Sequence, residues 1–395
     1  MKSGLLSGHV LLLGLIYLTF ISLGLPDSVL GVAWPAMRAE FGRSLEDAGL
    51  LTMILTTCSA VSGFASGFVL SRLGTGKVVA ISGFMTGLAL LGFALAPSFH
   101  WIVLLVIPLG LGAGSVDAGM NHFVARHYSA RHMNWLHGCW GVGATIGPVV
   151  MGAALAGRFG WQGGYAVIAA IQLLLALLFL RNLRLWEKEP ERAAAANSPP
   201  EGVKPVPTRA PVPPWAPWLA PALYIVYTTI EVGTGLWAAS ILVDGRGTDP
   251  ARAGLWVAGF FGAIMVGRFA IGLVANRLGN RLLVRLGIVG ALAGAVLFSI
   301  PLLPDLANLA GLMLLGLGCA PIYPALMHEA TNRFDPDTAR TVIGRQVAFA
   351  YVGCALGPAA LGLLGAHLGL WAIMPAVCLV LLLLLYMSWK LDQVT

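Results

Sequence analysis

The chain has 395 residues, of which 58% are hydrophobic and only 10% charged, and it carries a formal net charge of +7. Soluble globular domains are about 45–50% apolar and about 25% charged, so this chain has too few polar side chains to cover a soluble fold. The composition indicates a protein that crosses a membrane many times. It argues against a soluble enzyme and against a nucleic-acid-binding domain, because the Lys and Arg residues form no basic stripe.

Apolar windows predict twelve membrane-spanning helices, each close to the roughly 20 residues that a bilayer requires. The first is expected to be a true span and not a cleaved leader, because no small-residue cleavage site follows it. The twelve predicted spans are 10–34, 48–70, 78–96, 101–123, 135–156, 163–183, 218–242, 253–274, 282–301, 306–327, 343–365 and 371–389.

The segment 184–217 separates six predicted spans from the other six. It holds nine of the 23 prolines, together with Ala, Glu and Lys, a composition that cannot bury a core and is typical of a linker. We therefore expect three parts: a six-helix bundle over 1–183, a linker over 184–217 and a second six-helix bundle over 218–395.

The basic residues predict the orientation of the chain in the membrane. Of the 24 Lys and Arg residues, 18 fall at the termini, in the linker and in the loops and span ends on the same side, and five fall on the opposite side. Cytoplasmic loops carry the excess of basic residues. Both termini and the linker are therefore expected in the cytoplasm, with the protein in the inner (plasma) membrane.

Four short patterns recur in the same order in the two halves, which indicates that the halves are parallel repeats. Such repeats enclose a site between them near the middle of the membrane. The pairs are Gly67–Gly74 with Gly272–Gly279, Ala48–Leu51 with Ala253–Trp256, Leu109–Gly112 with Leu315–Gly318, and Gly143–Pro148 with Gly353–Pro358.

Six plus six spans, a central linker and Gly-x-x-x-x-Arg-x-Gly after spans 2 and 8 resemble the major facilitator superfamily. The resemblance implies an all-α fold of two pseudo-symmetric six-helix bundles and a monomeric transporter without a cofactor. It also implies a cytoplasmic gate at the motif. The chain departs from the family pattern in having Ser71 and Asn276 where an acid usually precedes the Arg, so the latch should be weaker or use other partners. The motif residues are Gly67, Arg72, Gly74, Gly272, Arg277 and Gly279.

Within the superfamily, the run from Leu109 through Asp117 and Asn121 to Phe123 resembles span 4 of the fucose and glucose proton symporters. A Gly-rich span 5 follows it, as in those proteins, and Asp27 occupies a place in span 1 comparable to an acid of the fucose permease. The resemblance implies a monosaccharide as solute and protons as the coupling ion.

Four charged residues inside predicted spans are candidates for a functional role, because a charge at the middle of a span costs at least about 2.5–3.5 kcal/mol and is functional by default. Asp27, Asp117 and Glu231 are the candidate proton-coupling groups, because a low-dielectric environment favours the neutral form of a carboxyl. Arg268 is a candidate solute ligand, although a side chain near the cytoplasmic surface can also snorkel. The alternative for each carboxyl is a hydrogen-bonded packing role.

Further solute contacts are expected from polar and aromatic residues inside the spans. Asn121 lies one helical turn from Asp117, and Tyr323 falls at the position of Asp117 in the second repeat. Each of these residues could equally serve packing alone. The candidate solute-binding set is Asn121, Trp140, Trp237, Tyr323, His137 and Arg268.

The sequence favours a secondary transporter that couples a small polar solute to protons by alternating access. A proton-driven exporter of drugs or metabolites is the alternative, supported by the Trp content and by a partial match of Gly143–Pro148 to the exporter motif. No catalytic triad, phosphate loop or metal spacing occurs, and the five cysteines form no CxxC. We therefore expect no enzyme activity, no metal and no disulfide.

Overall fold

The computed structural model describes residues 2–128, 130–187, 212–301 and 303–395. Within these ranges all regular structure is helical, and twelve helical segments are long and apolar enough to cross a membrane. Each of them overlaps one predicted span. The predicted all-α fold with twelve spans is therefore confirmed.

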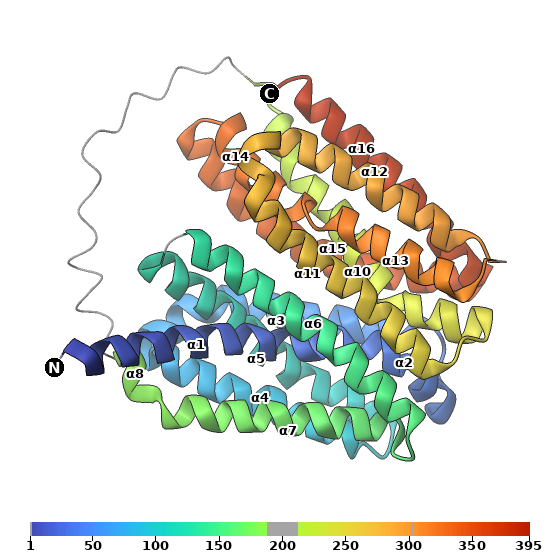
Figure 1. Cartoon of the computed structure of the whole chain (residues 1–395), viewed down its shortest axis with the longest axis horizontal. Coiled ribbons are helices and arrows are strands. Elements are labelled where there is room, and N and C mark those ends of the chain that lie inside the picture. Colours follow the sequence, from blue (N-terminus) through green and yellow to red (C-terminus); the bar gives the residue numbers. More distant parts are fainter. Residues whose placement is uncertain (1, 129, 188–211, 302) are drawn as a thin grey trace.

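The N-terminal half forms the lower bundle in Figure 1. Its first span, Val10–Phe41, is made of two helices that meet at Ser28, directly after Pro26 and Asp27. The predicted linker begins within the last short helix, and its part 188–211 lies outside the described residues. The helices are α1 (Lys2–Asp27), α2 (Val29–Phe41), α3 (Asp47–Leu73), α4 (Thr75–Ala94), α5 (Phe99–His127), α6 (Ala130–Ala156), α7 (Gly160–Arg181) and α8 (Leu183–Glu187).

The C-terminal half forms the upper bundle in Figure 1. Its fourth span, Asp305–Arg333, is also built from two helices, and Pro321 lies at the turn between them. The elements are α10 (Ala216–Arg246), α11 (Pro250–Leu278), α12 (Asn280–Ser299), α13 (Asp305–Cys319), α14 (Ile322–Arg333), α15 (Pro336–Leu368), the short η1 (Leu370–Ala372) and α16 (Ile373–Asp392).

The repeat seen in the sequence has the same backbone geometry in both halves at the gate motif. Gly74 and Gly279 both have φ of +76°, and each caps the start of the next helix, α4 or α12. A residue with a side chain rarely adopts this conformation. The final glycine of the motif therefore makes the tight turn between consecutive spans.

The repeated Gly-Pro pattern, Gly143–Pro148 and Gly353–Pro358, brings helices into close contact. A Cβ atom on Gly143 of α6 would lie 2.1 Å from the Ile21 carbonyl oxygen of α1. In the other half, a Cβ atom on Gly353 of α15 would lie 2.1 Å from the Thr228 hydroxyl of α10. Small residues let membrane helices approach closely. The shared Gly-Pro pattern thus packs the fifth span of each half against the first.

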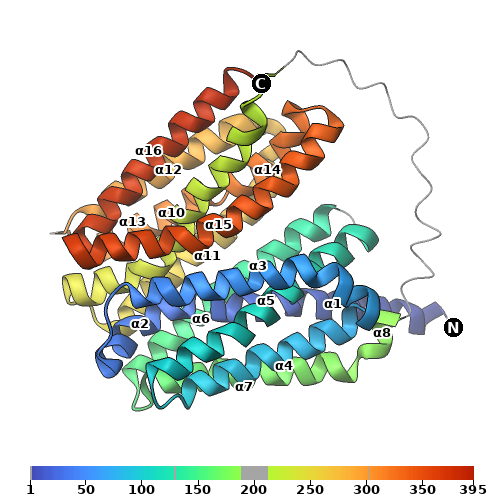
Figure 2. The same cartoon turned by 180° about the vertical axis from the view of Figure 1, so that it is seen from behind.

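The two halves lie side by side, and their ribbons diverge toward the end that carries the start of α1 (Figures 1 and 2). Helix α11 packs on α6 at the opposite end, where a Cβ atom on Gly254 would lie 2.9 Å from the Gly152 Cα. Arg38 of α2 also bridges to Asp244 of α10 there, at 2.9 Å between Nη2 and Oδ2. The halves are therefore closed against each other at one end.

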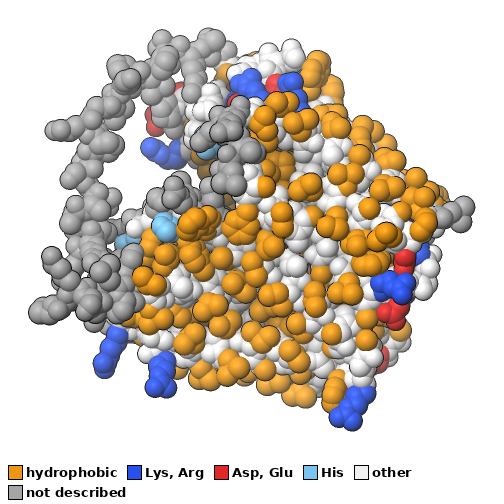
Figure 3. Space-filling model, in the orientation of Figure 1, with side chains coloured by type: hydrophobic (Ala, Val, Ile, Leu, Met, Phe, Trp, Pro, Cys, Tyr) orange, Lys and Arg blue, Asp and Glu red, His pale blue; other side chains and the backbone are white. Residues whose placement is uncertain are grey.

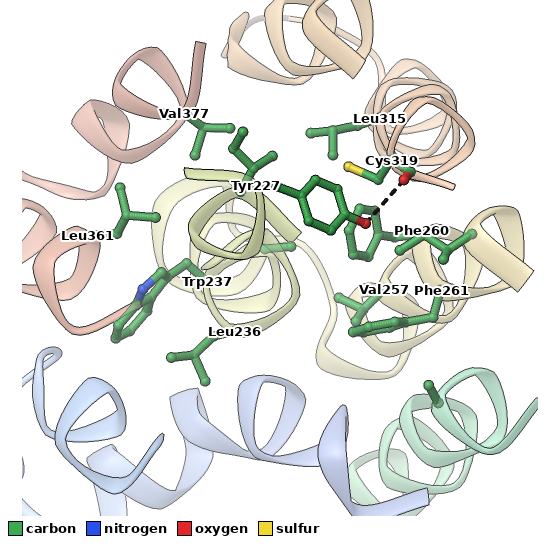
Figure 4. Close-up of a cluster of buried hydrophobic side chains, with 14 of the residues drawn as sticks. Tyr227, Leu236, Trp237, Val257, Phe260, Phe261, Leu315, Cys319, Leu361 and Val377 are labelled. Atoms are coloured by element: carbon green, nitrogen blue, oxygen red, sulfur yellow. Dashed lines mark hydrogen bonds between the residues drawn. The ribbon is translucent and has the colours of Figure 1, made fainter. Parts of the chain in front are cut away.

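The surface and the core of the protein are both apolar. Figure 3 shows hydrophobic side chains across the middle of one face, with charged groups toward its edges. Exposed residues such as Leu174 and Leu177 of α7 belong to this surface, as a bilayer requires. Inside the C-terminal half, Tyr227 and Phe260 are buried, and the Tyr227 hydroxyl donates to the Cys319 carbonyl oxygen at 3.1 Å (Figure 4).

Candidate solute and proton site

Asp27 occupies the break between α1 and α2, near the middle of the first span. Its Oδ2 accepts a hydrogen bond from the Trp140 indole nitrogen of α6 at 2.8 Å. Asp27 is exposed although it lies deep within a spanning segment. His137, one turn before Trp140 on α6, is exposed as well. Solvent therefore reaches the space between the halves where these two side chains lie.

Asp117 of α5 is hydrogen-bonded on both carboxyl oxygens. The Asn121 amide, one turn further along α5, donates to Oδ1 at 3.0 Å, which the one-turn spacing of the two residues allows. The Tyr351 hydroxyl of α15 donates to Oδ2 at 3.3 Å. Because α15 belongs to the other half, this bond spans the interface between the repeats.

Arg268 of α11 forms an ion pair with Glu231 of α10, at 3.0 Å between Nη2 and Oε1. The side chains are only 16% and 9% exposed. The guanidinium also lies over the Trp140 ring, 5.5 Å from its centroid. The structure therefore places the Arg268 head group in the interface between the halves, paired with a carboxylate, and not at the membrane surface.

Trp140 connects the two charged groups of the site. Its ring nitrogen binds Asp27 in the N-terminal half, and its ring face meets Arg268 from the C-terminal half. Phe261 of α11 contacts the same ring edge-on, with centroids 6.3 Å apart. Groups from α1, α6, α10 and α11 are thereby brought together at the center of the molecule.

Tyr323 of α14 is part of a tyrosine cluster beside this site. Its ring packs edge-on against Tyr224 at 4.8 Å between centroids, and the Tyr224 hydroxyl donates to its carbonyl oxygen at 2.9 Å. Tyr224 and Tyr227 were not among the predicted site residues. The signal was present, since both precede Glu231 at helical spacing and therefore share its face of α10.

Trp237 and His137 differ from the rest of the predicted solute-binding set. Trp237 is fully buried, and its indole nitrogen donates to the Pro358 carbonyl oxygen of α15 at 2.9 Å, so a solute has no access to it in this conformation. His137 packs its ring edge-on against Phe20 of α1, with centroids 5.6 Å apart. It lies at the exposed face of α6, on the side of the interface.

The predicted gate motif lies at the ends of α3 and α11. Arg72 is exposed, with its guanidinium 4.3 Å from the Phe68 ring centroid, and Gly67 has open space around it. Gly272 and Arg277 belong to α11, and their surroundings lie outside what the structure describes. The gate function of the motif stays a prediction.

The described residues include no group of His, Cys, Asp and Glu that could hold a metal ion, and the five cysteines are free. The chemistry available in the interface is hydrogen bonding, ion pairing and proton exchange at carboxyls. Two six-span repeats with such groups between them define a membrane transporter of the two-repeat class. The Major Facilitator Superfamily model matches residues 16–358 and 224–393, and the chain belongs to this family.

Curated relatives support the same assignment. An uncharacterized MFS-type transporter of Yersinia pestis is 27% identical over 373 residues, and the alignment covers 92% of each chain. A cis,cis-muconate transport protein of Acinetobacter baylyi is 24% identical over 351 residues, with 85% of this chain and 83% of the relative covered. These relatives and the family are transporters and not enzymes.

Solved structures show the same fold at low identity. A bacterial homolog of the human lysosomal transporter Spinster, in an inward-facing and occupied conformation, has a TM-score of 0.77 at 16% identity, covering 98% of this chain and 97% of that one. A variant of the nucleoside transporter NupG has a TM-score of 0.75 at 12% identity, covering 95% and 98%. The likeness confirms the superfamily fold, whereas the fucose and glucose branch stays a prediction.

Proposed function

We propose that this protein is a proton-coupled symporter of a small uncharged polar solute, with monosaccharides as the solute class. The observation that carries the proposal is the charge balance of the interface. Asp27 and Asp117 have hydrogen-bond donors but no cationic partner among the described residues. Asp117 is half-buried in the interface, where a carboxylate is costly unless it is neutralised, and a proton is the simplest ion that neutralises it.

Hydrogen-bonding groups supply the solute contacts in this proposal. Asn121, the Asp27 carboxyl and the Trp140 ring offer donors, acceptors and a flat apolar face, which suit a polyhydroxylated ring. We propose Tyr323 and His137 as further contacts. A protonated carboxyl donates one hydrogen bond and accepts others, so proton and solute binding support each other.

The proton would drive transport through the contact between the halves. A ligand shifts a two-state equilibrium only by its differential affinity for the two states. The bond from Tyr351 to Asp117 joins α15 to α5 and exists only while the halves keep this arrangement. Such a bond is stronger when its acceptor is ionised, so protonation of Asp117 weakens this arrangement and favours rearrangement of the halves.

The direction of opening follows from the proposed orientation in the inner membrane. If the 18 basic residues mark the cytoplasm, both termini lie there, and the end at which the two bundles diverge is the cytoplasmic end. The pair of Arg38 with Asp244 then closes the outer end. We therefore propose that the conformation described is open to the cytoplasm and that the protein works as a monomer.

The match of Gly143–Pro148 to the exporter motif no longer favours the alternative of a proton-driven exporter. Gly143 and Gly353 both pack a fifth-span helix onto the first-span helix of the same half, so the Gly-Pro pattern has a packing role common to both repeats. The aromatic residues of the interface remain compatible with a larger apolar solute.

A solute screen in proteoliposomes with a pH-sensitive dye inside tests the proposal. The panel should contain monosaccharides, nucleosides, cis,cis-muconate and lipophilic cations. We expect internal acidification only when a monosaccharide or a similar polyol is added outside. Acidification with muconate alone, or proton movement opposite to the solute, would refute the uncharged-solute symporter.

A further inference from the structure

We propose that Glu231 is a specificity-determining residue that excludes anions from the solute site by neutralising Arg268. This inference rests on the proposed function, because it refines the solute class of the same site. It concerns a residue that the sequence marked only as a candidate proton carrier. The assignment follows from the geometry of the ion pair and from the charges around it.

Arg268 is the cation that the structure places among the site groups, and its charge is already compensated. Glu231 holds one terminal nitrogen at 3.0 Å, and both side chains are largely excluded from solvent. A buried pair of this kind is costly to break, because the remaining partner keeps an uncompensated charge. An anionic solute would therefore meet a guanidinium whose charge the Glu231 carboxylate already compensates.

The guanidinium retains capacity for a second acceptor. Its Nε is buried and has no hydrogen-bond partner among the described residues. Its flat face is already covered by Trp140. Such a planar fork binds carboxylates through two parallel hydrogen bonds. The site is therefore built like a carboxylate subsite whose place is taken by the protein's own Glu231.

The other charges of the interface also disfavour an anionic solute. Asp27 and Asp117 have no cationic partner in the described ranges, so their ionised forms repel an incoming anion. With Glu231 bound to Arg268, the site as a whole is neutral or negative. The proposed function then leaves proton exchange to Asp27 and Asp117.

Removal of the Glu231 charge should open the subsite to anions. The experiment measures the thermal unfolding midpoint of the purified full chain in detergent against sodium acetate, with Glu231→Gln as the test variant. We expect an apparent acetate affinity tenfold or more above that of the wild type, because a hydrogen bond to a charged group is worth about this factor or more. Glu231→Asp keeps the charge and should behave like the wild type.

The Glu231→Gln/Arg268→Gln double variant separates a specific effect from general salt stabilisation. It has a similar volume but no guanidinium, so acetate should not raise its midpoint beyond the wild-type response. Equal acetate affinity of Glu231→Gln and the double variant overturns the proposal. Strong acetate binding by the wild type, lost in Arg268→Gln, overturns it as well, because Arg268 would then already serve anions.

If Glu231→Gln does not yield folded protein, a second variant tests the proposed role of Glu231. Arg268→Gln leaves the Glu231 carboxylate without its partner, and we expect methylammonium to stabilise this variant and not the wild type. Absence of that response contradicts the charge assignment. Neither probe depends on the transported solute or on proton coupling, so a wrong solute class and a wrong role of Glu231 give different results.

Discussion

Helix packing at Gly357 offers the sharpest test of the arrangement of α10 and α15. A Cβ atom on Gly357 would lie 2.3 Å from the Thr229 hydroxyl oxygen and 2.7 Å from the Thr229 Cα. Gly357→Ala therefore places a methyl group inside the van der Waals radius of a neighbouring backbone. The two helices must separate, or α15 must bend away, before the methyl group fits.

The expected cost is that of overpacking a tight contact, about 1–3 kcal/mol. At roughly 2–4 °C per kcal/mol, this corresponds to a fall of about 2–12 °C in the unfolding midpoint. Gly344→Ala is the matched control on the same helix, because a Cβ atom there meets nothing within 4 Å. It should be neutral or slightly stabilising, since Ala is about 1 kcal/mol better than Gly in a helix.

Thermal unfolding of the two variants in the same detergent measures the difference. The structure predicts a clear loss of stability for Gly357→Ala and none for Gly344→Ala. Equal midpoints for the two variants would refute the close approach of α15 to α10. A loss of stability confined to Gly344→Ala would mean that the close contact of α15 lies near Gly344 and not at Gly357.

Three further predictions concern the site, the closed end and the orientation. Trp140→Phe removes the indole donor to the carboxyl at the α1–α2 break. It should slow solute counterflow by about tenfold or more, since hydrogen bonds to charged groups are worth about 1.5–3 kcal/mol. An unchanged counterflow rate contradicts this prediction. Arg38→Asp should shift cross-linking between α2 and α10 toward the open form, and addition of Asp244→Arg should restore closure. The effect should be small, because a pair of this exposure is worth about 0.2–1 kcal/mol; no recovery in the double variant argues against the bridge. A cysteine at Asp305 should react with an impermeant reagent in intact cells while one at Ser198 is protected, and the reverse pattern contradicts the orientation.

The number and order of the spans could be predicted from sequence because each depends on local composition. A run of about 20 apolar residues is sufficient evidence for one helix across a bilayer. The repeat was visible for the same reason, since the glycines at 74 and 279 are required by the backbone itself. The ionisable residues could be identified because a charge inside a span is energetically costly and is therefore rare.

The partners of these residues could not be predicted in the same way. Tyr351 and Asp117 are 234 positions apart, and their contact depends on how two helices from different halves are rotated. In a soluble helix, the polar face shows that rotation. In the bilayer, lipid-facing and core-facing sides are both apolar, so Trp140 and Trp237 looked alike in sequence. The structure places one beside Asp27 and the other in the core.

The proposed mechanism depends on proton coupling at Asp117, and the Asp117→Asn variant tests this coupling. Asn mimics the protonated carboxyl at nearly the same volume, so the carrier should no longer need a proton to change conformation. With the solute identified by the screen, the measurement compares accumulation driven by a proton gradient with counterflow exchange in the same proteoliposomes. We expect Asp117→Asn to lose accumulation and to retain counterflow. Accumulation at the wild-type rate would exclude Asp117 as the proton-coupling residue and leave it a packing role.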